Sequence, residues 1–204
     1  MFDSRVPGSE HFDALFRDSD DPWQFRTRWF EARKRALTLA CLPAVRYASG
    51  YEPGCANGEL SAELALRCDQ LLVSDVSRRA VELARERLAA WSHVQVVQAQ
   101  LPRDWPAASF DLIVISELGY FLDAQAVDAL GDHTRDSLRP GGTVLACHWR
   151  RPIKGCALDG ESVHRRLAQR LGFAVLTEVR EADFILHVWS ADGRSVAERE
   201  GFDW

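Results

Sequence analysis

The chain has 204 residues, of which 47% are hydrophobic and 27% are charged. This length and composition are typical of one globular domain, and they exclude the disordered, collagen-like and disulfide-scaffold classes. Thirty acidic side chains against twenty-five lysines and arginines give a formal net charge of -5. Nucleic acid is therefore not expected as a partner, because proteins bind it mainly through clustered cations.

The chain shows no signal for a membrane span, for export or for a metal site. Its longest uncharged apolar run, 112–116, is far shorter than the roughly 20 residues of a transmembrane helix. The first residues contain neither a basic segment nor an apolar one, so we expect no secretory signal and a cytoplasmic protein. The five cysteines include no C-x-x-C pair, and the histidines lack a spacing such as H-E-x-x-H. Reduced thiols and no metal are expected.

Short β-branched runs alternate with amphipathic runs from Arg46 onward, which predicts βαβ units around a mainly parallel sheet. The predicted strands are 46–52, 71–75, 93–98, 110–116, 143–149, 173–179 and 184–190, and the last two form an antiparallel pair. The predicted helices are 59–67, 77–90, 124–138 and 161–171, with Asn57 and Ser77 as N-caps of the first two. Residues 1–43 contain no strand pattern, so we expect one domain with a helical cap at 1–43, a core at 46–190 and a tail at 191–204.

Polar residues gather where the first two strands end. In open α/β sheets ligands bind outside the carboxyl ends of the strands. The turn Glu52 to Gly58 follows the first strand, and its glycines permit a positive φ or the close approach of a ligand. Asp75 ends the second strand, where a carboxylate can accept hydrogen bonds from ribose hydroxyls. The dinucleotide pattern G-x-G-x-x-G needs glycines where Ala56 and Glu59 stand, so an adenosyl ligand without phosphate is favoured over NAD. Glu52 is placed to face a cation such as an ammonium group.

These segments together resemble the successive motifs of class I S-adenosylmethionine-dependent methyltransferases. The likeness is carried by the glycine turn, Asp75, the strand Phe110 to Glu117 (FDLIVISE) and Leu138 to Gly142 (LRPGG), and it covers about residues 46–190. The front of the chain, with DPWQFRT at 21–27 and EARK at 31–34, is similar to the opening of the nodulation protein S (NodS-like) subfamily, as is HWR at 148–150. The resemblance implies a Rossmann-like sheet in the order 3-2-1-4-5-7-6 with an antiparallel last strand, and an N-terminal segment that closes over the cofactor.

The resemblance further implies S-adenosylmethionine as cofactor, with S-adenosylhomocysteine as product. The implied cofactor residues are Trp23 and Arg26 at the methionine end, Glu52, Gly54, Cys55 and Gly58 in the turn, Asp75 at the ribose, Val76, Gln100 and Leu101 around the adenine, and Ser116 at the end of the fourth strand. Cys55 is expected to fill space and to carry no chemistry, as buried free thiols usually do.

Methyl transfer from a sulfonium needs alignment of acceptor, methyl group and sulfur, but no nucleophile from the protein. An amine acceptor must be neutral to attack, so a nearby base would help. His148 is the first candidate because imidazole titrates close to neutral pH, and Glu117 is the second, with orientation of the acceptor as its other possible role. Tyr120 and Trp149 are expected to bound the acceptor pocket.

The expected activity is methyl transfer to an amine nitrogen of a small molecule or saccharide. The alternatives left open are O- or carboxyl-methylation of a metabolite, an adenosyl-ligand binder without turnover, and a nicotinamide oxidoreductase. Trp23 has packing of a helix onto the sheet as its other interpretation, and the basic stretch 26–35 is expected to be a solvated helix face. The oligomeric state is not predicted.

Overall fold

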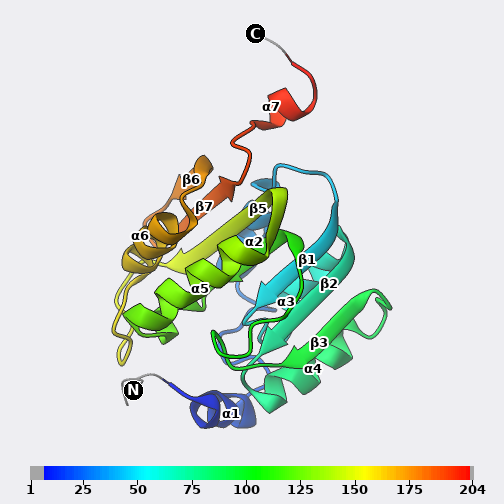
Figure 1. Cartoon of the computed structure of the whole chain (residues 1–204). Helices are drawn as coiled ribbons and strands as arrows, with labels where there is room; N and C mark the ends of the chain where they lie inside the picture. Colours follow the sequence, from blue (N-terminus) through cyan, green and yellow to red (C-terminus); the bar gives the residue numbers. More distant parts are fainter. Residues whose placement is uncertain (1–6, 203–204) are drawn as a thin grey trace.

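The computed structural model describes residues 7–202 (Figure 1). One sheet of seven strands has the order β3-β2-β1-β4-β5-β7-β6. β7 runs antiparallel to both of its neighbours, and the other neighbouring strands pair in parallel. The predicted fold class and strand order are confirmed. Residues 1–6 of the expected cap, which include the start examined for a secretory signal, and residues 203–204 of the expected tail lie outside the described residues.

The elements follow the predicted alternation of strands and helices. The strands are β1 (Tyr47–Pro53), β2 (Cys68–Asp75), β3 (Val94–Gln98), β4 (Phe110–Ser116), β5 (Leu138–Trp149), β6 (Ala174–Arg180) and β7 (Phe184–Ser190). The helices are α1 (Ser9–Asp18), α2 (Trp29–Ala40), α3 (Glu59–Ala65), α4 (Arg78–Leu88), α5 (Ala124–Ser137), α6 (Gly160–Leu171) and α7 (Val196–Arg199), with a 3₁₀ turn η1 (Gly119–Phe121) after β4. β5 begins before the expected residue 143, because Leu138 already pairs with Phe110 across an irregular register.

β4 shows how the sheet is buried on both faces. Leu112 and Val114 pack into the cluster on the face covered by α3, and Ile113 and Ile115 pack into the cluster on the face covered by α5 and α6. All four side chains are at most 1% exposed. Burial of each stabilises the fold by about 1.5 to 3 kcal/mol relative to exposure, so the centre of the sheet is a rigid base for the residues at its strand ends.

One of the two predicted helix caps is present. The Ser77 hydroxyl accepts a hydrogen bond from the Ala80 N–H at 3.2 Å, which confirms Ser77 as the N-cap of α4. The prediction for Asn57 is wrong, because Gly58 at φ 81° precedes α3 and no side chain caps it. The Asn57 amide instead donates to the Asp20 carbonyl and to the Asp21 carboxylate, both at 3.1 Å. It therefore ties the N-terminal segment to the turn after β1.

The N-terminal helix α1 covers the carboxyl ends of β1 and β2. α1 lies at the end of the sheet toward which β1 and β2 point, and α7 projects from the opposite end (Figure 1). Phe16 of α1 is 2% exposed and packs with Ala80 and Leu83 of α4. The cap thus covers the edge of the sheet at which a ligand is expected.

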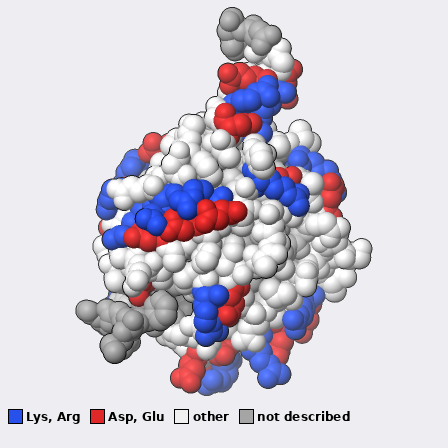
Figure 2. Space-filling model, viewed as in Figure 1, with Lys and Arg blue, Asp and Glu red and all other residues white. Residues whose placement is uncertain are grey.

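The described surface carries acidic and basic side chains close together. Figure 2 shows acidic and basic side chains next to one another on the viewed face. The ion pairs of the described chain include Asp128–Arg166 and Asp132–Arg170, which join α5 to α6. Within residues 7–202, none of the helices is long and apolar enough to cross a bilayer. The five cysteines are free thiols.

Candidate active site

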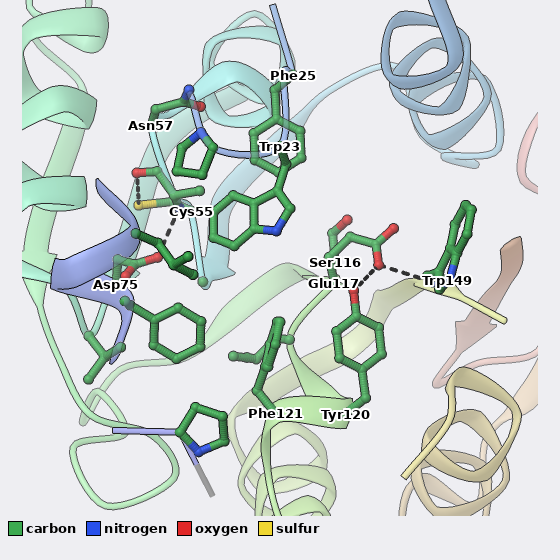
Figure 3. Close-up of a pocket in the computed structure, with 18 of the residues that line it drawn as sticks. Trp23, Phe25, Cys55, Asn57, Asp75, Ser116, Glu117, Tyr120, Phe121 and Trp149 are labelled. Atoms are coloured by element: carbon green, nitrogen blue, oxygen red, sulfur yellow. Dashed lines mark hydrogen bonds between the residues drawn. The ribbon is translucent and has the colours of Figure 1, made fainter. Parts of the chain in front are cut away.

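A cavity of about 940 Å³ opens at the carboxyl ends of β1, β2 and β4 (Figure 3). It is lined by the turns that follow these strands and is covered by α1, α2 and the loop between them. The predicted site residues that line it are Trp23, Glu52, Gly54, Cys55, Asp75, Val76, Gln100, Leu101, Ser116, Glu117, Tyr120 and Trp149. Arg26, Gly58 and His148 are not part of its lining.

Asp75 presents its carboxylate to the cavity in one fixed orientation. One oxygen, Oδ2, accepts from the Ala56 N–H, and the other, Oδ1, accepts from the Ser77 N–H, both at 2.9 Å. Ala56 reaches Asp75 because its φ of 49° lies in the left-handed region. Burial raises the pKa of Asp75 to about 6, although the backbone N–H groups act in the opposite direction. Each oxygen keeps a lone pair for a hydroxyl donor from a ligand.

The turn after β1 is held against β2 by its backbone. The N–H groups of Gly54 and Cys55 both donate to the Ser74 carbonyl, at 2.7 and 2.9 Å. Gly54 has a φ of 77°, which a residue with a Cβ rarely adopts. The turn is therefore rigid before any ligand arrives.

Gly58 has a packing role in this structure. A Cβ at this position would lie 3.3 Å from the Ala84 Cα, so Gly58 permits the close packing of α3 on α4, while its predicted part in the cofactor turn stays a prediction. The glycine pattern of the turn could not separate these two requirements, because both produce a glycine at a strand-to-helix turn.

Glu52 is an acidic group held in an apolar environment. It is 2% exposed, lines the cavity, and accepts a hydrogen bond from the Ser61 hydroxyl at 2.5 Å. Burial raises the pKa of Glu52 to about 8. A cation placed beside this carboxyl would favour its ionised form.

The loop before α2 contributes Trp23 but not Arg26. The Trp23 ring lies between Phe16 and Phe25, with centroid distances of 5.5 and 5.6 Å, and all three line the cavity. Arg26 is partly exposed and does not line the cavity; it donates at 2.9 Å to Glu59, which does line it. Its predicted contact with the methionine end of the ligand stays a prediction.

The residues predicted around an adenine lie beside Asp75. The Ala99 N–H donates to the Asp75 carbonyl at 3.0 Å. Gln100 and Leu101, which follow β3 in the chain, therefore lie next to the carboxyl end of β2. Together with Val76 they line the same cavity. Val76 and Leu101 offer apolar side chains here, as binding sites for flat aromatic ligands do.

At the other end of the cavity, Glu117 joins three separate elements. It follows β4 with a φ of 55°, a conformation that residues other than glycine rarely adopt. Its Oε1 accepts from the Lys34 Nζ at 2.5 Å, and its Oε2 accepts from the Trp149 N–H at 3.0 Å and from the Tyr120 hydroxyl (Figure 3). Burial acts to raise the pKa of Glu117, but the Lys34 charge and these hydrogen bonds hold it below its ordinary value.

Lys34 is the buried partner of two carboxylates. It is 6% exposed and lies 3.0 Å from Glu31, which is 8% exposed, in addition to its contact with Glu117. Burial acts to lower the pKa of Lys34, but the two carboxylates raise it above its ordinary value. The expectation that the basic stretch 26–35 is a solvated face is therefore wrong for Lys34, and this cluster has one negative charge in excess.

His148 cannot act as a base in this cavity. It is 0% exposed, its Nε2 accepts from the Gly119 N–H at 3.0 Å, and its Nδ1 is bonded to His164 at 3.0 Å. Burial lowers the pKa of His148 to about 4. Neighbouring residues of a strand point to opposite faces, so Cys147 faces one side of the sheet and His148 faces the other.

Several residues of the lining were not predicted from the sequence. They include Phe12 and Phe16 of α1, Phe25, Glu31, Lys34, Ala56 and Phe121. In the sequence, the aromatic residues of this group cannot be told from residues that only pack a helix onto the sheet. The pair Glu31 and Lys34 has the spacing of two charged neighbours on one helix face, and that spacing is equally common on exposed helices.

Comparison with known proteins places this geometry in a family. The model of the family "Nodulation protein S (NodS)" matches residues 10–152. A nodulation protein S from Bradyrhizobium diazoefficiens is 38% identical over 128 residues, which cover 62% of this chain and 61% of that protein. The chain thus matches about three fifths of the length of this curated relative.

Two solved structures are similar over most of the chain. A protein from Pseudomonas syringae assigned as a methyltransferase is 55% identical, with a TM-score of 0.72, over 80% of this chain and 99% of that one. The N-methyltransferase NodS from Bradyrhizobium japonicum WM9, in complex with S-adenosylhomocysteine, is 28% identical, with a TM-score of 0.75, over 88% of this chain and 97% of that one. The chain belongs to the nodulation protein S (NodS) family.

Proposed function

We propose that this chain transfers a methyl group from S-adenosylmethionine to an amine nitrogen of a small molecule or saccharide. One observation carries the proposal: a single cavity joins the oriented Asp75 carboxylate at one end to the Glu31–Lys34–Glu117 cluster at the other. The NodS relative that binds S-adenosylhomocysteine supports the choice of cofactor.

The residues present fit this cofactor. Asp75 would hold the ribose hydroxyls, Val76, Gln100 and Leu101 would flank the adenine, and Glu52 would face the ammonium group of the methionine part. The Asn57 Oδ1 atom is buried at the cavity without a hydrogen-bond partner, so the lining also holds an acceptor that no protein group uses. When bound, the cofactor supplies a methyl group on a positively charged sulfur, which an aligned nucleophile can accept.

The acceptor end suits a group that becomes positively charged. An amine enters neutral and gains a charge as it takes the methyl group. The excess negative charge of the Glu31–Lys34–Glu117 cluster favours that charge in a buried site, where electrostatic interactions are stronger than in water. Tyr120 and Trp149 offer the broad apolar faces that a sugar ring can pack against.

We assign Glu117 to orientation and not to proton removal. Its two oxygens already accept from Lys34, Tyr120 and Trp149, and its pKa lies below the ordinary value. A carboxylate of that kind is a poor proton acceptor at neutral pH. The protein therefore aligns an amine that has already lost its proton, and the proton of the methylated product leaves to water.

The test separates binding from turnover. Calorimetry with S-adenosylhomocysteine and with NADH asks which ligand binds, and mass spectrometry of a panel of amines, amino sugars, alcohols and carboxylic acids asks which acceptor gains a methyl group. We expect S-adenosylhomocysteine to bind and an amine to be methylated. Binding without any product would identify an inert binder, a methylated oxygen would identify an O-methyltransferase, and binding of NADH alone would refute the proposal.

We further propose that residues 1–204 act as one methyltransferase unit in the cytoplasm, without nucleic acid or membrane as partner. The five free thiols support a reducing compartment, and the formal net charge of -5 supports the absence of a polyanion partner. Cell fractionation of the tagged chain and salt-dependent binding assays with nucleic acid and with anionic vesicles test these statements.

A further inference from the structure

Three histidines outside the cavity lie in a row next to its acceptor end. They are His148 on β5, His164 on α6 and His187 on β7. Nδ1 of His148 is 3.0 Å from Nε2 of His164, and Nδ1 of His164 is 2.7 Å from Nδ1 of His187. His148 and His164 are 0% and 3% exposed. Water therefore reaches the row mainly at His187.

The position of each ring proton follows from the donor at the inner end. The Gly119 N–H can only donate, so His148 Nε2 accepts, and a neutral His148 carries its proton on Nδ1. That proton is donated to His164 Nε2, which leaves the His164 proton on Nδ1, where it is donated to His187 Nδ1. The His187 proton then lies on Nε2, which is 3.8 Å from the Glu178 carboxylate.

The inner end of the row holds the segment that carries the acceptor-end residues. A Cβ on Gly119 would lie 2.3 Å from Val163 of α6 and 3.1 Å from His148 Nε2, so the segment fits closely between them. The Tyr120 ring stands edge-on to His148, with ring centroids 5.5 Å apart, and its hydroxyl donates to Glu117. A shift of the Gly119 amide would therefore move both cavity residues.

Charged groups face both ends of the row. They are Glu117 and Lys34 beside His148, and Arg180, Glu178 and Glu161 beside His164 and His187. At the inner end Glu117 acts to raise the pKa of His148, and Lys34 acts to lower it. Burial is the main cause that lowers the pKa of all three imidazoles, which keeps the row neutral near neutral pH.

We propose that His148 is a positioning residue: as the inner end of a neutral, proton-ordered row of three histidines, it holds the Gly119 amide and thereby fixes Tyr120 and Glu117 at the acceptor end. An added proton must occupy a nitrogen that now accepts, so it converts a hydrogen bond into a contact between two donors. On His148 Nε2 that contact would oppose the Gly119 amide itself. The effect on turnover rests on the proposed function, whereas the proton arrangement does not.

The arrangement of protons is tested by nuclear magnetic resonance of the isotope-labelled full chain near neutral pH. We expect His148 and His164 to carry the proton on Nδ1 and His187 to carry it on Nε2. Acidification that protonates the row should shift the Gly119 amide signal together with the histidine signals. A proton on His148 Nε2 at neutral pH, or a Gly119 signal that does not follow the row, overturns the proposal.

The positioning role is tested by two substitutions at one site. His148→Gln keeps an acceptor for the Gly119 N–H, and His148→Leu does not. We expect His148→Leu to raise the acceptor KM or to lower kcat by about tenfold, and His148→Gln to recover most of that loss. The affinity for S-adenosylhomocysteine should stay unchanged in both variants. His133→Gln, at an exposed position of α5, is the matched control. Equal losses in both variants would show that ring packing alone matters and would overturn the proposal.

Two further outcomes keep the test decisive. If His148→Leu does not fold, His164→Leu takes its place, because it removes the acceptor of the His148 proton and is expected to speed hydrogen exchange of the Gly119 amide by about tenfold. Unchanged exchange would overturn the proposal. If the wild-type chain methylates no acceptor, the proposed function fails, and the resonance measurements still decide this inference.

Discussion

Asp75→Asn tests the ribose contact with little change in shape. In the wild-type chain, each carboxylate oxygen accepts one backbone N–H and keeps a lone pair toward the cavity. Asparagine keeps one such oxygen and replaces the other with a donor. The loss of one charged acceptor costs about 1.5 to 3 kcal/mol of binding free energy, which raises the dissociation constant of S-adenosylhomocysteine about 10- to 150-fold.

The same substitution should leave the ligand-free fold almost as stable as before. Burial raises the pKa of Asp75 to about 6, so above that pH the carboxylate is charged and its burial costs folding stability. Removal of the charge relieves this cost and offsets the lost hydrogen bond from one backbone N–H. We expect the free energy of unfolding, measured by urea denaturation without ligand, to change by less than about 1 kcal/mol.

Binding should also depend on pH in a defined direction. Hydroxyl donors stabilise the charged form of Asp75 and lower its pKa in the complex, so affinity is fully present above about pH 6 and is lost as the pH falls through this value. Asp75→Asn should remove this dependence. Asp69→Asn, on the same strand but exposed and paired with Arg46, is the matched control. Calorimetry that finds the wild-type dissociation constant in Asp75→Asn, or an equal loss in Asp69→Asn, would refute the reasoning.

Three more predictions address other residues of the site and its wall. Burial raises the pKa of Glu52 to about 8, and a bound ammonium group should lower this pKa. The affinity for S-adenosylhomocysteine, measured by calorimetry, should therefore rise as the pH increases toward 8. The rise should be smaller in Glu52→Gln. Lys34→Met leaves the two buried carboxylates Glu31 and Glu117 without their cation and should destabilise the fold by about 3 to 5 kcal/mol in urea denaturation. Lys154→Met, at the exposed second lysine, should change the stability little. Gly119→Ala places a methyl group against a valine of α6 and should cost about 1 to 3 kcal/mol of stability; a wild-type unfolding curve would contradict the close fit.

The strand-end residues that line the cavity were largely predictable from the sequence. Strand ends are marked locally: an apolar run stops, and a polar residue such as Asp75 or Ser116 follows. Ser77 two residues later is a helix cap, which fixes where the next helix begins. Because parallel strands end at the same edge of the sheet, these local signals are enough to place residues that are distant in sequence around one cavity.

The face of a fully buried strand was not predictable. Val144 to Cys147 are all 0% exposed, so β5 shows no alternation of apolar and polar residues that would tell one face from the other. His148 was placed at the correct strand end but could not be assigned to a face. The pairing of Ala146 with His187, and the packing of His164 on the same side, settle the face only once the sheet is assembled.

The acceptor end depends on contacts that no short segment contains. Glu117 can hold its left-handed backbone because Lys34 from α2, Tyr120 from η1 and the Trp149 N–H from β5 all bond to its carboxylate. Each of these groups alone has an ordinary role, as a helix lysine, a buried tyrosine or a strand amide. Their convergence on one carboxylate sets the charge and the shape of this end of the cavity. If the proposed function holds, we expect substitutions in α2 or η1 to change the accepted substrate while the end of the cavity built from β1 and β2 stays as it is.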